Sequence, residues 1–396
     1  MKKALMLLSL GVLAVAACQK TAVPETPAKD VSLQGTEVDV KRFPLDVKKV
    51  FVLNEGGMGA NNATLDFLRR SDGRYITGAF RKMNPGAKAG LGDVGNDIAV
   101  HGNEVWMVIS NSGLVEVVSA ADETEMAVIE VPTPRNIAFD GQYAYVSSWA
   151  GAFATYGADY TITDSANPKG CVYRIDLNTY KTAGTVEVGY QPEGIAYYDG
   201  KLYVANSGGI SSQLPPAYSY DNTVSIIDTE SFAVSRTVAV EVNLKNVYSD
   251  GQGVIYVTSM GNYYDIPSGL YCFPADAPDK VEHVWSELFK HTHVSSSCIL
   301  GDEVYCVGTE NEFAFGEAHE YTVWSYSAQQ GKIAFYPISL TGVPYGIMAL
   351  GQDLLLVGDA GDYFNPGTLN LYDLSGQDRL WSVTAGVCPG HFAVWK

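Results

Sequence analysis

Polar side chains that could hold a ligand stand at the start of seven short apolar runs spaced along the sequence. Taken together, their amide, carboxylate, phenol and imidazole groups offer both donors and acceptors, which suits a polar ligand. Asn and Asp are also ordinary turn residues at the starts of strands, so each position alone favours a structural role and only the set favours binding. The candidates are Asn96, Asp97, Asn136, Glu193, Asn246, Tyr345 and His391.

Aromatic residues crowd the longer segments between these runs. A rim of tyrosines suits a bulky and largely uncharged ligand, because each ring offers apolar area and each phenol hydroxyl a hydrogen bond. The opposing interpretation is that the rings pack the loops onto the protein, and we expect this of roughly half of them, since Tyr and Phe are often partly buried. The candidates are Trp149, Tyr156, Tyr218, Tyr263, Tyr264, Phe315 and Tyr363, together with Asn206 at the end of an apolar run.

No motif for catalysis is found in the sequence. The G-x-S-x-G nucleophile elbow, the H-E-x-x-H zinc motif and the phosphate-binding G-x-x-x-x-G-K-[ST] loop are all absent. His291 and His293 alternate as they would on one face of a strand, but a zinc site needs further ligands, so a surface pair is the better interpretation. The sequence therefore predicts no enzyme, no catalytic cofactor and no metal site.

A repeated turn identifies the elements that would carry these residues. Asp-Gly, Gly-Asn and similar turns recur at spacings of 39, 59, 51, 50 and 50 residues, and each separates a short apolar run from a more apolar one. A third run follows and ends at a polar turn, as in NTVSIIDTESF. Short strands with this punctuation are typical of four-stranded β-propeller blades. The turns lie at Gly102, Gly141, Gly200, Gly251, Gly301 and Gly351.

The two ends of the chain complete the count of strands. The segment VFVLN at residues 50–54 has the pattern of a second strand with no first strand before it, and the C-terminal CPGHFAVWK that of a first strand with no second strand after it. We therefore predict an all-β fold, a seven-bladed β-propeller in which the C-terminal strand completes the N-terminal blade and leaves no open edge. An open stack of sheets or two sandwiches would not explain the complementary ends.

This topology places the candidates on one face. If the strands of each blade run up and down from the axis outward, the tight turns between first and second strands share one face. The long loops between second and third strands share the opposite face with the starts of the first strands. The polar and the aromatic candidates then surround one axial mouth.

The N-terminal residues indicate export. Two lysines, an apolar run from Ala4 to Val15 and small residues before Cys18 are typical of a bacterial lipoprotein signal. We predict a signal peptide over residues 1–17, a lipidated Cys18 at the start of a flexible tether over 18–46, and the propeller over 47–396. An ordinary secretory signal with a cysteine nearby is the alternative.

Charge and cysteine content limit the partners. The formal net charge is −18, and residues 1–17 carry two lysines and no acidic residue, so the processed chain would carry −20. Nucleic acid is therefore not expected as a partner, and a membrane only through the lipid anchor. Five cysteines remain besides Cys18, and their apolar surroundings favour buried thiols.

Several segments resemble a known family of propellers. The repeat GYQPEGIAYYDGKLYVANSGG with NTVSIIDTESF is similar to that of YncE-like propellers. The segments VLNEGGMGANNATLDF, GDVGNDIAV, YVSSWAG and YVTSMGNYYDIPSGLY resemble the exported propeller lipoproteins of Bacteroidetes, one branch of which binds cobalamin at the cell surface. The resemblance covers residues 50–396 and is specific for the fold, whereas it bears on function only through the GDVGND and YVTSMGNYYD segments.

The resemblance implies a non-enzymatic protein that binds cobalamin tightly on the loop-rich face. It also implies a TonB-dependent outer-membrane transporter as the partner that receives the corrinoid, and a lipid-anchored location at the outer membrane, exposed at the cell surface. One departure is that Cys18-Gln19-Lys20-Thr21 lacks the acidic run that often follows the lipidated cysteine in this group. Surface exposure is therefore less firmly implied than lipidation.

Two other function classes remain open. The aromatic rim would equally suit an interaction platform for another protein or a glycan. A metal-dependent propeller hydrolase or lactonase would need Glu, Asn and Asp ligands at the axis, for which Glu193, Asn136, Asn246 and Asp97 are the available residues.

Overall fold

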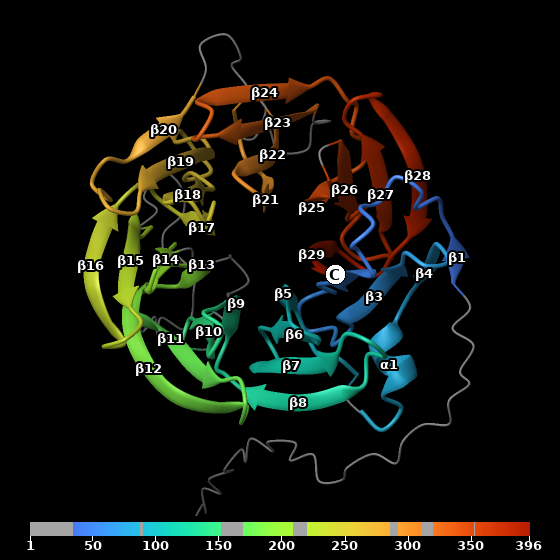
Figure 1. The fold of residues 1–396 in the computed structure, drawn as a ribbon, viewed down its shortest axis with the longest axis horizontal. Helices are drawn as coiled ribbons and strands as arrows, with labels where there is room; N and C mark the ends of the chain where they lie inside the picture. Colours follow the sequence, from blue (N-terminus) through green and yellow to red (C-terminus); the bar gives the residue numbers. More distant parts are fainter. Residues whose placement is uncertain are drawn as a thin grey trace, which may run out of the picture. The chain divides into compact units, whose positions relative to one another are not determined.

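The computed structural model describes residues 35–87, 90–151, 169–208, 220–285, 292–309, 320–351 and 353–396. The contacts divide the chain into Met1–Ser32 and Leu33–Lys396, and every described residue belongs to the second unit. In this unit seven antiparallel sheets stand around a common axis (Figure 1). The predicted all-β, seven-bladed β-propeller is thus confirmed. Apart from the strands, the described residues contain the short helix α1 (Ala79–Met83), and none of their helices is long and apolar enough to cross a membrane.

We number the blades I to VII and give their strands from the axis outward. Blade I contains β29 (Pro389–Trp395), β2 (Lys49–Asn54), β3 (Thr64–Arg69), β4 (Arg74–Ile76) and β1 (Thr36–Glu37). Blade II contains β5 (Gly95–His101), β6 (Glu104–Ile109), β7 (Leu114–Ser119) and β8 (Glu125–Glu130). Blade III contains β9 (Pro134–Phe139), β10 (Tyr143–Ser148), β11 (Lys169–Asp176) and β12 (Lys181–Tyr190). Blade IV contains β13 (Pro192–Tyr198), β14 (Lys201–Asn206), β15 (Thr223–Asp228) and β16 (Ala233–Ala239).

The remaining blades follow the same plan. Blade V contains β17 (Leu244–Ser249), β18 (Val254–Ser259), β19 (Gly269–Pro274) and β20 (Glu282–Val284). Blade VI contains β21 (Ser296–Leu300), β22 (Glu303–Thr309), β23 (Tyr321–Ser327) and β24 (Lys332–Tyr336). Blade VII contains β25 (Pro344–Ala349), β26 (Leu354–Asp359), β27 (Thr368–Asp373) and β28 (Asp378–Thr384).

The hydrophobic core is divided among the spaces between blades. Seven clusters of buried side chains occur, one between each pair of neighbouring blades. The second strand of each blade is covered on both faces and is buried along nearly its whole length, as in β2. The outermost strands are largely exposed, as in β8. Each blade therefore needs both of its neighbours to bury its apolar surface.

The ring closes as the sequence predicts. Strand β29 pairs antiparallel with β2, from Trp395 opposite Lys49 to Pro389 opposite Asn54. Lys49 connects blade I to blade II. Its buried ammonium donates to the Glu123 carboxylate at 2.5 Å and to the Ala121 carbonyl at 2.6 Å in blade II. The C-terminal strand thus pairs with the free edge of β2.

The packed part of the chain begins earlier than residue 47. Strand β1 pairs with β4 as a fifth strand of blade I. Phe43 and Val47 are buried in the cluster between blades I and VII, and Arg42 pairs with Asp373 at 2.5 Å. The predicted tether over 18–46 is therefore too long at its C-terminal end, because Phe43 packs against a blade formed by residues far away in sequence. The rest of that segment, including Cys18, and the signal peptide lie outside the described residues.

Candidate functional site at the axial ends of the innermost strands

The innermost strands begin two or three residues before the apolar runs that predict them. The polar candidates therefore lie inside these strands and not in front of them. In six of the seven strands the register shifts at this point, which marks a β-bulge, whereas β21 pairs without a shift. A bulge breaks the alternation of side chains and re-aims one of them, which frees a polar residue from the core. The bulges explain how polar residues can stand within buried strands.

One buried carboxylate at the axis pairs with two cations. Arg135 and Glu193, in blades III and IV, are both nearly fully buried, and the guanidinium Nη2 lies 3.1 Å from Oε2. Lys245 of blade V places its Nζ 3.3 Å from the same oxygen and is 41% exposed. The guanidinium also lies over the Trp149 ring, 4.4 Å from its centroid. Burial acts to raise the pKa of Glu193, but the two cations outweigh it and hold the pKa below its usual value.

A second carboxylate, the half-buried Glu55, faces the same axis from blade I. The Tyr345 hydroxyl of blade VII donates to Glu55 Oε2 at 2.5 Å. Burial raises the pKa of Glu55, and burial together with the Glu55 charge raises that of Tyr345. The ring of Tyr363, on the loop between β26 and β27, meets the Tyr345 ring edge-on with centroids 5.9 Å apart. This contact connects the axial residues to the loop-rich face.

Two further candidates have shifted pKa values. Asp97 accepts the backbone N–H groups of Ile98 at 2.8 Å and Ile137 at 2.9 Å, and burial raises its pKa to about 6. Burial, assisted by the charges of Lys245 and Arg135, lowers the pKa of His391 to about 3. His391 is therefore a neutral imidazole at pH 7 and can both donate and accept.

Two of the amide candidates, Asn96 and Asn246, link neighbouring blades, whereas the bond of Asn136 lies within blade III. Asn96 donates through Nδ2 to the Arg135 carbonyl at 2.7 Å. The backbone N–H of Asn136 donates to the Ser147 hydroxyl at 3.0 Å. Asn246 donates through Nδ2 to the Ser297 hydroxyl at 3.0 Å. Bonds of this kind join blades II to III and V to VI around the axis. We refer to Asn96, Asp97, Asn136, Glu193, Asn246, Tyr345 and His391, with Arg135, Lys245 and Glu55, as the axial cluster.

Asn206 lies apart from this cluster. It is fully buried at the end of β14, where Nδ2 donates to Thr223 Oγ1 at 2.9 Å and to Ser225 Oγ at 3.0 Å. Its Oδ1 accepts the Gly189 N–H at 3.1 Å. Asn54 occupies the same position in blade I, with Thr64 and Gly386 as partners. This arrangement gives Asn206 a role in tying the loops of the blade together, and its side chain does not face the axis.

The aromatic candidates fall into three groups. Trp149 is half-buried beneath the Arg135 guanidinium. Tyr263, Tyr264 and Tyr363 are exposed by 44%, 52% and 47%, and the neighbouring Phe364 by 85%. Tyr156, Tyr218 and Phe315 lie outside the described residues.

The axial cluster has the chemistry of a binding site more than that of a metal site. In the described part of the chain, no three His, Cys, Asp or Glu side chains are grouped so that they could hold a metal ion. Glu193, the strongest candidate ligand of a hydrolase metal, is already balanced by two cations. The cluster offers closely spaced hydrogen-bond donors and acceptors, and its positive and negative charges nearly cancel.

The five cysteines after Cys18 are all free thiols, and they are buried or half-buried. Burial raises the pKa of Cys388 to about 11, so this thiol stays protonated and unreactive at neutral pH. The cysteines therefore act as small core residues, as the sequence predicts.

The residues that sequence reasoning missed have partners that are distant in sequence and lie in a neighbouring blade. Glu55 directly follows β2 and meets Tyr345 across the ring closure. Tyr248 donates to the Ser297 carbonyl at 2.9 Å and extends the polar lining along the inner strands. The period-two pattern of β17 was a usable signal for Tyr248, because it places Tyr248 on the same face as Asn246.

Comparison with known proteins supports the fold. No protein-family model matches the chain, and no curated protein sequence matches it. Among solved structures, hydrazine synthase from Kuenenia stuttgartiensis is similar, with a TM-score of 0.57 at 15% identity over 75% of this chain and 88% of that chain. At this identity the similarity concerns the fold alone. This chain is therefore a β-propeller, a fold compatible with a binding protein or an interaction platform.

Proposed function

We propose that this chain is a non-catalytic binding protein that captures cobalamin and related corrinoids on its loop-rich face. In this proposal Cys18 is lipidated and anchors the protein at the outer membrane, exposed at the cell surface. The bound corrinoid then passes to a TonB-dependent outer-membrane transporter. The formal net charge of −18 argues against nucleic acid as a partner.

The axial cluster is the observation that carries this proposal. Its charged groups pair mainly with one another, as Glu193 does with Arg135 and Lys245, and His391 is neutral. The face therefore offers hydrogen bonds without a strong demand for a charged ligand. A corrinoid is a broad, flat ring system fringed with amide groups, and each amide needs both a donor and an acceptor.

Exposed rings around the cluster add the apolar contact that a large ligand needs. Tyr263 and Tyr264 project from the loop between β18 and β19, and Tyr363 from the loop between β26 and β27. Aromatic residues with few rotatable bonds lose little side-chain entropy when a ligand covers them. The loops of blades V and VII are thus the parts of the rim that we expect to contact the ligand.

The direct test is comigration with a corrinoid. The purified protein is mixed with cyanocobalamin at about micromolar concentration and separated by size exclusion, with detection of the corrinoid colour. We expect the corrinoid to elute with the protein. If it elutes alone, the corrinoid proposal is wrong.

Substitution of the rim aromatics tests the location. The double variant Tyr263→Ala/Tyr264→Ala should weaken cyanocobalamin binding and unfold at the same urea concentration as the parent. Met126 on the outermost strand β8 is 47% exposed, so Met126→Ala removes comparable exposed apolar area away from the axis. Unchanged affinity in the double variant would place the site elsewhere on the rim.

The second candidate is an interaction platform for a protein or glycan. Phe364 favours it, because a phenylalanine that is 85% exposed on a loop is typical of an anchor residue for a partner. Absence of corrinoid binding together with loss of a captured partner on Phe364→Ala would support this candidate.

A further inference from the structure

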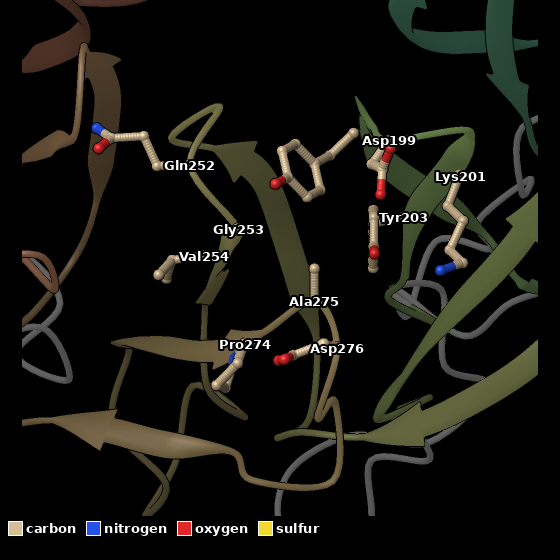
Figure 2. Close-up of a pocket in the computed structure, with 10 residues that line it drawn as sticks. Asp199, Lys201, Tyr203, Gln252, Gly253, Val254, Pro274, Ala275 and Asp276 are labelled. Atoms are coloured by element: carbon tan, nitrogen blue, oxygen red, sulfur yellow. The ribbon is translucent and has the colours of Figure 1, made fainter.

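A pocket lies on the face opposite to the axial cluster, between blades IV and V. Its volume is about 400 Å³, within the range of small-molecule sites. Figure 2 shows side chains of blade IV on one side and those of blade V on the other. Its lining includes Asp199, Lys201 and Tyr203 from blade IV and Gln252, Ala275 and Asp276 from blade V.

Comparison among the blades shows why the pocket exists. At two blade pairs, a ring from the turn between the third and fourth strands of the next blade covers the aromatic residue of the second strand. Trp106 is covered by Tyr180, with ring centroids 5.8 Å apart, and Tyr145 by Phe232 at 6.0 Å. Tyr180 and Phe232 lie in the turns between the third and fourth strands of blades III and IV.

The corresponding turn of blade V has no ring. It reads PADAPDK from residue 274 and offers Ala275 and Asp276 to the space beside Tyr203. Phe273 of β19 covers the Tyr203 ring at this blade pair, and the turn adds no second ring, so space remains beside the turn. Because protein interiors are close-packed, a space of this size open to solvent is filled by water or by a ligand.

Four other blades carry Tyr or Trp at the equivalent position, and the polar atom of each is hydrogen-bonded. The Tyr145 hydroxyl donates to Asp140 at 2.6 Å, that of Tyr256 to the Asp302 carbonyl at 3.1 Å and that of Tyr305 to Glu303 at 2.9 Å. Trp106 donates its Nε1–H to Glu104 at 3.0 Å.

Tyr203 is the exception. The residue is only 1% exposed, and its ring is held against Phe273 with centroids 6.2 Å apart. Its hydroxyl makes no hydrogen bond to any residue that the structure describes, although it lines the pocket. Burial raises the pKa of Tyr203 to about 12, so the hydroxyl remains protonated at neutral pH. The hydroxyl can therefore bond to water or to a ligand in the pocket.

We propose that this pocket binds a neutral polyhydroxylated ring of monosaccharide size, with the Tyr203 hydroxyl as its central hydrogen bond. A sugar needs donors and acceptors at short intervals, and the lining supplies phenol, ammonium, carboxylate and carboxamide groups. The one lysine is outnumbered by two aspartates, so an anionic ligand is disfavoured. The half-buried phenol ring of Tyr198 offers apolar area to the C–H face of the sugar.

Calorimetric titration of the purified chain with single sugars tests the proposal. The probes are D-glucose, D-galactose, D-mannose and N-acetyl-D-glucosamine, each up to about 10 mM. We expect at least one to bind. Tyr203→Phe should weaken that binding about five- to tenfold, because it removes one hydrogen bond and leaves the ring in place. Ala275→Phe places a ring in the pocket and should abolish binding.

The matched control is Tyr145→Phe, which removes the equivalent hydroxyl at a blade pair where Phe232 already covers the ring. This variant should bind the sugar with unchanged affinity. Thermal unfolding of each variant shows that the fold is retained. Failure of all four sugars to bind, or equal affinity of the parent and Tyr203→Phe, would overturn the proposal. The pocket and the axial cluster lie on opposite faces, so cyanocobalamin binding does not depend on this outcome.

Discussion

Glu193 is the carboxylate that pairs with both cations of the axial cluster. It is buried, and it pairs with a buried arginine and a half-exposed lysine. Replacing one partner of a buried ion pair leaves the other charge without compensation. We therefore expect Glu193→Gln to lower the free energy of unfolding by about 3–5 kcal/mol in urea titrations.

Lys245→Met is the matched variant, because Lys245 is 41% exposed and water can screen its charge. We expect it to cost less than about 1 kcal/mol. Equal losses in the two variants would show that Glu193 depends on Lys245 as much as on Arg135.

His391 makes stability depend on pH in a direction that can be worked out. Its pKa is about 3 in the folded chain and about 6.5 in an unfolded chain. As the pH falls below about 6.5, the unfolded state takes up a proton that the folded state does not. Relative to His391→Gln, the parent should therefore lose up to about 1.4 kcal/mol of stability per pH unit.

Chemical denaturation of both proteins at pH 7, 5.5 and 4.5 measures the difference. Asp97 titrates in part of the same range, but it is present in both proteins and its contribution cancels in the comparison. If the stabilities of the two proteins change with pH in parallel, His391 takes up its proton at the same pH in the folded and the unfolded chain.

Two loops on the candidate face are built alike. In the loop after β18, Asn262 Oδ1 accepts the backbone N–H groups of Tyr264, Asp265 and Ile266 at 2.8–3.0 Å. In the loop after β26, Asp362 Oδ1 accepts those of Phe364 and Asn365 at 2.8–3.0 Å. Tyr263 and Tyr363 have φ values of +57° and +67°, which are uncommon for bulky residues. Each loop thus holds an exposed aromatic pair in one conformation.

Loss of the asparagine acceptor should loosen the first loop alone. We expect Asn262→Ala to speed hydrogen exchange at the amides of residues 264–266 by about tenfold or more, because their common acceptor is removed. Global stability should change little, since the loop is exposed. Asn178→Ala, in the turn between β11 and β12, is the control and should leave those amides unchanged. Unaltered exchange in Asn262→Ala would mean that packing, and not the side-chain acceptor, orders the loop.

Ring closure determines the stability of the propeller as a unit. Strand β29 covers the edge of β2, and its side chains contribute to the core clusters on both sides of blade I. A chain that ends at Cys388 lacks this strand. We expect it to lose cooperative unfolding and to elute as aggregate, because an exposed strand edge invites pairing with other chains.

The control is a chain that starts at Val38 and lacks β1, an added outer strand. It should remain monomeric with a similar unfolding midpoint. A truncated chain ending at Cys388 that unfolds like the parent would show that closure is unnecessary.

The sequence by itself determined the features that depend on neighbours along the chain. Turn residues at regular spacing and the period of apolar runs are local signals, and they predicted the strands, the seven blades and the pairing of the two ends. The resulting topology also placed the loops on one face. These inferences hold because a blade is built from consecutive strands joined by short turns.

Only the tertiary structure decided which side chains meet. Arg135 and Glu193 are 58 residues apart, and Tyr345 and Glu55 are 290 apart, so their pairing depends on how blades stand around the axis. The bulges that turn the polar residues out of the core are shifts of register between two strands, which neither strand shows alone. Asn206 looked like a rim residue in the sequence, but its partners across the blade bury it.

The pocket beside Tyr203 is likewise a feature that the sequence alone does not determine. The aromatic position in β14 is visible in the sequence, yet the space beside it depends on a turn of blade V that carries no ring. A missing contact can be recognised only when the neighbouring blade is in place. Local periodicity therefore specifies the propeller, whereas the packing between blades specifies its sites, because each site is shared by residues from different blades.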